Sequence, residues 1–170
     1  MELYVVRHAV AYKRDPQLWP DDGERPLTPE GEAEFRGAAY GLGSLLPSVD
    51  ALLSSPLVRA WQTAEILAGL GGWPEPKAFP ALEPESSPEV AALALEAYSD
   101  SGAVVVVGHR PGLHELVSYL LTGDAEADVS IKKGGALRLS IDGPPGPKTA
   151  ALRWLLTPAL LGSRASLEAF

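Results

Sequence analysis

Residues 2–8 read ELYVVRH, a short apolar run that ends in an arginine and a histidine side by side. A continuous apolar run of this length, rich in β-branched residues, is typical of a buried parallel strand. Residues 103–109 read AVVVVGH and follow the same pattern, with four consecutive valines before the glycine and histidine. We therefore predict two buried strands, and each of them ends at a histidine, His8 or His109.

Three weaker strand patterns complete the predicted sheet, at residues 49–55, 136–141 and 150–156. The last two are joined by DGPPGPK, a proline- and glycine-rich turn segment that predicts an antiparallel hairpin. Residues 71–88 are also rich in proline, and we expect them to form an extended connection over the surface.

Helix starts are marked by a repeated pattern, a serine or threonine followed directly by proline, which occurs at Thr28, Ser55, Ser87 and Thr157. The hydroxyl accepts a hydrogen bond from an unpaired helix N–H, and proline lacks an N–H that would have had no partner. Helices are predicted at 29–43, 56–69, 88–99 and 112–122, with a short one near 158–161. Strands that alternate with helices indicate a three-layer α/β/α fold with a mainly parallel central sheet and a C-terminal β-hairpin. We expect one domain over residues 1–170, because no repeat or long linker divides the chain.

The composition excludes several classes of protein. The chain has no cysteine, which excludes disulfides, thiolate metal sites, iron–sulfur clusters and cysteine nucleophiles. Its formal net charge is −8, whereas a general nucleic-acid-binding surface is positive. No apolar run approaches the roughly 20 residues of a membrane span, and the N-terminal residues do not resemble a signal peptide. We expect a cytoplasmic protein with no nucleic-acid or membrane partner.

Two histidines and an arginine are predicted to meet at one edge of the sheet. Ligands of open α/β sheets gather at the carboxyl ends of the strands, so His8 and His109 converge there if their strands are neighbours. The helix expected to begin near Pro56 starts at the same edge and carries Arg59 about one turn further on. Together with Arg7, these side chains form a predicted oxyanion site that holds an imidazole nucleophile.

A phosphoryl group suits such a site. Its charge is spread over three oxygens, which arginine side chains bind bidentately. A neutral imidazole can attack phosphorus at physiological pH, and water then hydrolyses the phosphohistidine that results. Clustered arginines disfavour the protonated ring and keep His8 neutral. This chemistry requires no metal and no cofactor, and the sequence has no visible metal-ligand spacing.

Four motifs carry a family resemblance, in this order along the chain: VVRHA at 5–9, RPLTPEG at 25–31, SSPLVRAWQTAE at 54–65 and VVVVGHRPGL at 104–113. They resemble the histidine phosphatase superfamily, which has the phosphoglycerate mutase-like fold. The short chain, the RPLTPEG segment, KKGGALRL at 132–139 and the closing WLLTP are similar to the SixA-type phosphohistidine phosphatases within that family. The resemblance implies that the chain is an enzyme, a phosphoric monoester hydrolase or phosphohistidine phosphatase.

The resemblance also implies a role for each site residue. His8 would be the nucleophile that accepts the phosphoryl group. Arg7, Arg59 and His109 would form the phosphate pocket around it. Arg25, at the start of RPLTPEG, would be a further substrate contact.

The general acid is the part of the family pattern from which this sequence departs. Many members carry a glutamic acid in an LxE context after the second helix, whereas residues 81–88 here read ALEPESSP. Glu83 and Glu85 lie near the expected place without fitting the pattern, and Glu83 is the candidate acid. An acid is needed most for an alkoxide leaving group and least for an imidazole, which protonates readily. The departure therefore favours phosphohistidine or another activated phosphoryl substrate.

The leading hypothesis is a metal-independent phosphatase that works through a phosphohistidine intermediate on His8. Its partner would be a phosphorylated protein, with phosphohistidine favoured, or a small phosphoester. The unmatched acid leaves open a non-catalytic sensor that binds phosphate or a phosphoprotein. A phosphoglycerate mutase-like phosphotransferase is a third alternative, which the short chain and the unmatched glutamic acid disfavour.

Three other basic residues receive no role at the predicted site. His114, in the helix expected after His109, is predicted to pack in the interior or to face solvent. Lys132 and Lys133 are adjacent, and such a pair is typical of a solvated turn, although it could bind an acidic partner near the site.

Overall fold

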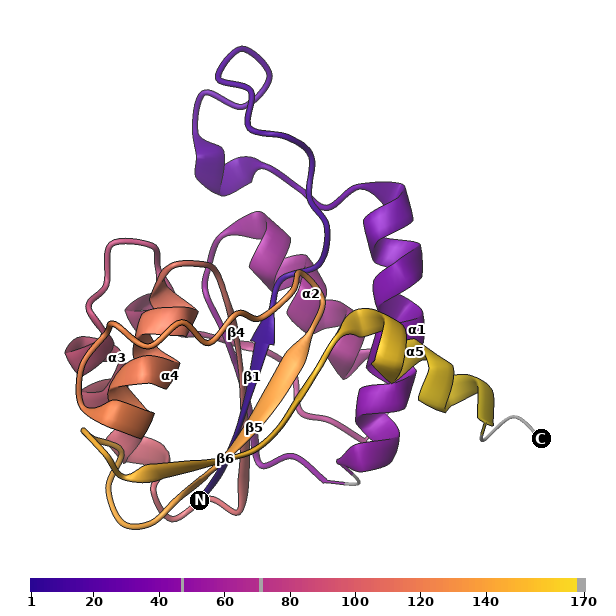
Figure 1. The fold of residues 1–170 in the computed structure, drawn as a ribbon. Helices are drawn as coiled ribbons and strands as arrows, with labels where there is room; N and C mark the ends of the chain where they lie inside the picture. Colours follow the sequence, from indigo (N-terminus) through magenta and orange to yellow (C-terminus); the bar gives the residue numbers. More distant parts are fainter. Residues whose placement is uncertain (47, 71, 168–170) are drawn as a thin grey trace.

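The computed structural model describes residues 1–46, 48–70 and 72–167, which form a six-stranded sheet with helices on both faces (Figure 1). The strand order is β3-β2-β4-β1-β5-β6. The strands are β1 Glu2–Arg7, β2 Ala51–Ser54, β3 Lys77–Ala78, β4 Ala103–Gly108, β5 Ala136–Ile141 and β6 Ala150–Leu156. No helix among the described residues is long and apolar enough to cross a membrane.

Strand β1 lies near the centre of the sheet and decides its organisation. It pairs in parallel with β4, and Arg7 lies opposite Gly108 at the carboxyl end of the pair. On its other side β1 pairs antiparallel with β5, and β5 in turn pairs antiparallel with β6. Strands β2 and β3 continue the parallel part beyond β4. This arrangement confirms the predicted α/β fold with a mainly parallel sheet and a C-terminal hairpin.

The helices cover the sheet in two layers (Figure 1). They are α1 Pro29–Leu45, α2 Val58–Ala68, α3 Pro88–Leu95, α4 Gly112–Thr122 and α5 Pro158–Leu167. Three short 3-10 turns join them, η1 Asp22–Glu24, η2 Pro80–Leu82 and η3 Glu96–Tyr98. Buried residues of α1, α2 and α5 pack on one face of the sheet, and those of α3 and α4 pack on the other.

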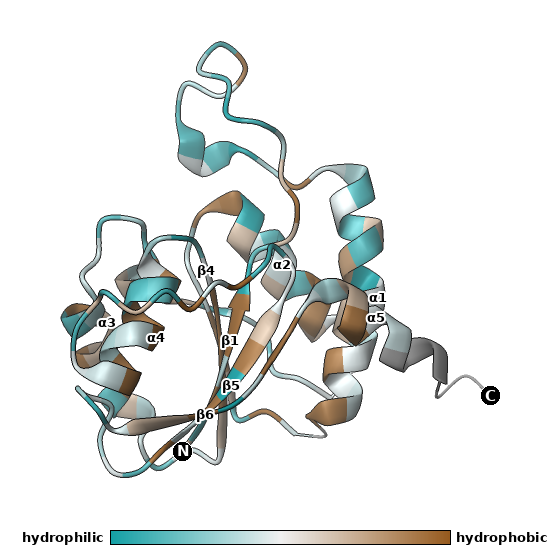
Figure 2. Cartoon of the chain, in the orientation of Figure 1, coloured by the Kyte–Doolittle hydropathy of each residue, from teal (hydrophilic) through white to brown (hydrophobic). Residues whose placement is uncertain are grey.

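The alternation of side chains along the buried strands explains the two cores. Tyr4 and Val6 of β1 join the core beneath α1, α2 and α5, whereas Leu3 and Val5 join the opposite core. A strand directs successive side chains to opposite faces, so a continuous apolar run serves two apolar layers at once. Figure 2 shows the same pattern, with the central strands largely hydrophobic.

The proline-marked helix starts are found in three of the four predicted places. Thr28 accepts a hydrogen bond from the Gly31 N–H at 3.0 Å, and Ser87 accepts one from the Val90 N–H at 3.4 Å. Thr157 accepts one from the Leu160 N–H at 3.3 Å. The prediction for Ser55 is wrong, because α2 begins at Val58 after a residue with no side-chain cap.

Two segments differ from the predicted pattern. Residues 71–88 were expected to be only an extended connection, but they contain the two-residue edge strand β3 and the turn η2. Such a short strand has too few residues to show a period in the sequence. Helix α5 is also longer than the short helix expected near 158–161.

Residues 11–27 form an excursion that projects from the body of the molecule (Figure 1). An isolated bridge between Ala11 and Leu27 closes its base. Near its start the rings of Tyr12 and Trp19 pack with their centroids 5.3 Å apart. Figure 2 shows that much of the excursion is hydrophilic, so it presents polar groups above the carboxyl end of β1.

The contact between α1 and α5 predicts a difference between two glycines of α1. A Cβ atom on Gly41 would lie 1.9 Å from the backbone oxygen of Leu161, whereas a Cβ on Gly37 would meet nothing within 4 Å. Gly41→Ala should therefore lower the free energy of unfolding by about 1–3 kcal/mol, because the helices must separate. Gly37→Ala should raise it by about 0.5–1 kcal/mol, because alanine is the better helix former. Urea unfolding of both variants is the measurement, and equal effects would contradict the observed packing.

Candidate active site

The two histidines at the ends of β1 and β4 lie together. The His8 N–H donates to the Gly108 carbonyl at 3.0 Å, so the ladder between the strands continues one residue past β1. The ring centroids of His8 and His109 are 5.1 Å apart, and the two side chains are 7% and 3% exposed. The predicted convergence of the histidines therefore occurs because their strands are parallel neighbours.

The backbone fixes the tautomer of His8. Its Nδ1 lies 2.7 Å from the Ala9 carbonyl oxygen, which can only accept a hydrogen bond. Nδ1 therefore carries the proton in the neutral ring, and Nε2 keeps a free lone pair. Burial lowers the pKa of His8 to about 3, and the charges of Arg59 and Arg7 act in the same direction. His8 is consequently a neutral imidazole with an unprotonated Nε2 at physiological pH.

A serine hydroxyl orients His109. Ser55 Oγ lies 2.8 Å from His109 Nε2 and accepts the Leu57 N–H at 3.4 Å. The hydroxyl proton is therefore available to Nε2, and we assign the ring proton to Nδ1 on this basis. Burial lowers the pKa of His109 to about 2, with further lowering by His8 and Arg59. His109 thus offers a neutral Nδ1–H donor, and Ser55 contributes to the site instead of capping α2.

Two arginines complete the group around His8. Arg7 ends β1, and its Nη1 donates to the Ile131 carbonyl at 2.9 Å. Arg59 lies in the first turn of α2 and is 5% exposed, and its Nη1 donates to the Asp22 carbonyl at 2.8 Å. These bonds use Nη1 of each guanidinium and leave its Nε–H group free to bind another acceptor.

Three buried side-chain nitrogens of this group have no hydrogen-bond partner. They are Arg7 Nε, Arg59 Nε and His109 Nδ1, and no other buried side-chain nitrogen or oxygen of the described residues shares this property. An unpaired buried donor costs about 1–3 kcal/mol, so three of them around one histidine require an explanation. Donors collected at one place are suited to the oxygens of an anion.

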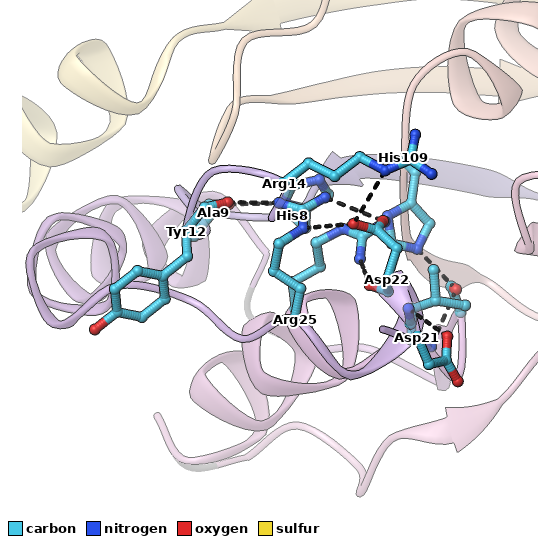
Figure 3. A network of polar contacts seen from close by, with 12 residues as sticks. His8, Ala9, Tyr12, Arg14, Asp21, Asp22, Arg25 and His109 are labelled. Carbon is cyan, nitrogen blue, oxygen red and sulfur yellow. Dashed lines mark hydrogen bonds and ion pairs between the residues drawn. The ribbon is translucent and has the colours of Figure 1, made fainter. Parts of the chain in front are cut away.

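Asp22 is a member of the site that the sequence analysis did not single out. Its carboxylate accepts hydrogen bonds from Arg25 Nε at 2.8 Å and Nη2 at 3.2 Å (Figure 3). The same carboxylate lies 3.3 Å from Arg59 Nη2. The hydrogen bond from Arg25 is the main cause that lowers the pKa of the Asp22 carboxyl, which therefore stays ionised. Asp22 ties the excursion to α2, and the available sequence signal was an acid three residues before Arg25.

Arg25 lies among these residues, but with two protein partners of its own. Besides Asp22, its guanidinium bonds to the Tyr12 carbonyl, with Nη1 2.6 Å from the oxygen (Figure 3). Arg14, also on the excursion, reaches the Asp22 carboxylate at 3.9 Å. In this arrangement Arg25 braces the excursion, and its role as a substrate contact stays a prediction.

Glu83, the candidate acid, lies at the end of η2 and lines a cavity of about 510 Å³. The other lining residues are Arg14, Asp21, Asp22, Gly23, Leu57, Pro84 and Glu85. Since Asp22 contacts Arg59, this cavity adjoins the arginine side of the site. Glu83 therefore lines a cavity next to Arg59, and residues 21–23 of the excursion line the same cavity.

No group of three or more histidine, aspartate or glutamate side chains that could hold a metal ion is present among the described residues.

Comparisons with known proteins place the chain in a family. The profile of the Histidine phosphatase superfamily (branch 1) matches residues 3–83. The chain belongs to the histidine phosphatase superfamily. An uncharacterized protein of Picosynechococcus sp. is 37% identical over 141 residues, which cover 82% of this chain and 84% of that protein. The phosphohistidine phosphatase SixA of Escherichia coli is 29% identical over 127 residues, covering 73% of this chain and 76% of SixA.

Solved structures of phosphatases share the fold. The structure of the protein histidine phosphatase SixA complexed with tungstate matches with a TM-score of 0.78 at 24% identity, over 94% of this chain and 98% of that one. The α-ribazole phosphatase of Shigella flexneri matches with a TM-score of 0.71 at 18% identity, over 93% and 97% of the two chains. The family and fold that the sequence motifs predicted are confirmed.

From the low pKa values of His8 and His109 we predict that neither ring titrates near neutral pH in the folded protein. The ring resonances of His8 and His109 in NMR spectra should stay those of neutral imidazoles from pH 8 to pH 5, because the folded-state pKa values are about 3 and about 2. In the urea-unfolded chain both rings should titrate near the free value of about 6.5. The unfolded chain then binds more protons, so stability should fall as the pH drops below about 6.5. A folded-state midpoint near that of the unfolded control would contradict the assignment.

Proposed function

We propose that this protein is a metal-independent phosphatase that acts through a phosphohistidine intermediate on His8. The observation that carries the proposal is the state of the His8 ring. The Ala9 carbonyl holds the proton on Nδ1, and the ring lies near His109 and in the field of Arg7 and Arg59, each of which has a buried nitrogen with no protein partner. A neutral nucleophile surrounded by oxyanion donors is the arrangement that phosphoryl transfer requires.

The first step forms the intermediate. Nε2 of His8 attacks phosphorus with its lone pair, and the bond from phosphorus to the leaving group breaks. The leaving group keeps the electron pair of that bond and takes up a proton. Arg7, Arg59 and His109 bind the phosphoryl oxygens, where charge is concentrated during transfer. The His8 ring becomes cationic when Nε2 is bonded to phosphorus. The Ala9 carbonyl stabilises that cation through the Nδ1–H bond.

The second step restores the enzyme. A water molecule attacks phosphorus, the N–P bond breaks, and its electron pair returns to Nε2 of His8. Inorganic phosphate then leaves, and the ring is again neutral with its proton on Nδ1. The proton lost by the water replaces the one that the leaving group took in the first step, so the cycle is balanced.

The leaving group determines how much acid catalysis is needed. We propose protein phosphohistidine as the substrate, because an imidazole leaving group has a pKa near 6.5 and is protonated without a strong acid. The resemblance of the chain to proteins named phosphohistidine phosphatase SixA supports this choice. A small phosphoester is the other substrate class, and Glu83 would then supply the proton from the adjoining cavity.

A non-catalytic phosphate sensor is the second candidate function. The observation that favours it is the segment ALEPESSP, which does not match the family pattern around the acid. Saturable binding of phosphate or vanadate without turnover of any substrate, and without a labelled intermediate, would establish the sensor.

Replacement of the nucleophile tests the proposed chemistry. His8→Ala should lower the turnover of an aryl phosphate by at least about 1,000-fold, because the covalent step is lost. The wild-type protein should also retain an acid-labile label from a ³²P-phosphorylated substrate, and His8→Ala should not. Phosphate binding by His8→Ala, measured by calorimetry, serves as the control for an intact site. Undiminished turnover in this variant would overturn the mechanism.

The role of Glu83 separates the two substrate classes. Glu83→Gln should slow hydrolysis of alkyl phosphates by about 100-fold and change that of a phosphohistidine protein by less than about threefold, because only the alkoxide needs the acid. Glu85→Gln is the matched control, since Glu85 lines the same cavity. The wild-type protein, compared on both substrates at one pH, should have the higher kcat/KM for the phosphohistidine protein. A strong preference for phosphoesters would contradict the proposed substrate.

A further inference from the structure

Residues 131–135 are fastened to the two residues at the carboxyl end of β1. The Gly134 N–H lies 3.0 Å from the Arg7 carbonyl oxygen and 3.1 Å from that of His8. In return the Arg7 N–H donates to the Gly135 carbonyl at 3.1 Å. Gly134 has a φ of +73°, a conformation that glycine adopts without strain. The segment therefore has a fixed position against the backbone of the proposed nucleophile.

His114 of α4 forms a hydrogen bond with the start of the same segment. The Ile131 N–H donates to His114 Nε2 at 3.3 Å, and the Ile131 carbonyl accepts Arg7 Nη1 at 2.9 Å. His114 is 7% exposed and Ile131 is fully buried. Of the two predictions for His114, packing in the interior is the one that the structure confirms. The backbone of Ile131 is thus hydrogen-bonded to both α4 and Arg7, which fixes the start of the turn that follows.

Lys133 lies in the middle of that turn. The turn is closed by a hydrogen bond from the Gly135 N–H to the Lys132 carbonyl at 2.8 Å. The side chain of Lys133 is exposed, and it takes part in none of the ion pairs of the described residues. The turn therefore places the backbone of Lys133 next to Gly134, which is bonded to the His8 carbonyl, and its ammonium forms no ion pair among the described residues.

The charge of Lys133 acts on the same site as the arginines. Its ammonium contributes to the low pKa of His8. Partial burial lowers the pKa of Lys133 itself, and the charges of Arg7 and Arg59 lower it further. Like charges held together in this way repel one another unless an anion lies between them. Lys133 thus lies in an exposed turn, as predicted, and its charge also acts on the site.

We propose that Lys133 is a further substrate-binding residue, whose ammonium binds an oxygen of the phosphoryl group at His8. The inference rests on the proposed phosphatase function and adds a cation to Arg7, Arg59 and His109. Lysine acts as a point charge without the fixed directions of a guanidinium. It should therefore bind the substrate dianion and the transition state about equally, which affects KM more than kcat.

Removal of this charge is the test. Lys133→Met keeps the length of the side chain, and Lys132→Met is the matched control at the neighbouring position of the turn. The dissociation constant of inorganic phosphate, from calorimetry, and the KM for an aryl phosphate should each rise about 10- to 100-fold in Lys133→Met, as expected for loss of a charged hydrogen bond. kcat should change by less than about threefold. Lys132→Met should match the wild-type protein in both measurements.

The outcomes distinguish this inference from the proposed function. Unchanged phosphate affinity in Lys133→Met, with a wild-type protein that binds and hydrolyses its substrate, overturns only the role of Lys133. An equal loss in Lys132→Met also overturns it, because the effect would then be general to basic residues of the turn. A wild-type protein that binds no phosphate and turns over no substrate overturns both proposals together.

Discussion

The parallel pairing of β1 with β4 is the constraint on which the site depends. Arg7 lies opposite Gly108, so the next residues, His8 and His109, leave the sheet at the same edge. A slip of one residue would turn the side chains of β1 to the other face. The buried valines of both strands prevent such a slip, because each face of the sheet has its own apolar layer. Core packing therefore sets the distance between the two imidazoles.

Around this pair the molecule concentrates positive charge despite a net charge of −8. Asp22 is the counter-charge of both Arg59 and Arg25, whose guanidinium groups contact its carboxylate. Burial keeps both imidazoles neutral in the field of the arginines. In the proposed mechanism these cations bind the phosphoryl oxygens, while the neutral Nε2 of His8 attacks phosphorus.

The residues around His8 and those around Glu83 are held by different parts of the molecule. The backbone of β1 and the segment 131–135 hold the atoms around His8 rigidly. Glu83, in contrast, borders a cavity that is also lined by Arg14 and Asp22. In the proposed mechanism the nucleophile is thus held by the sheet, whereas the leaving group meets groups supplied by loops, which suits variation of the substrate on one fold.

Short-range patterns were sufficient for every strand except the two-residue β3, for most helix starts and for the histidines at the strand ends, because hydrophobic period and caps are local properties. Ser55 shows where such reasoning fails, since a serine before a proline predicts a cap and its actual partner, His109, is 54 residues away. Asp22 and Arg59 are 37 residues apart, and Arg7 meets Ile131 across 124 residues. Those partners, and the place of the Lys133 turn next to His8, depend on the tertiary structure. Hydrogen bonds and charges act between residues that are far apart in sequence, so no periodic pattern in the sequence reveals them.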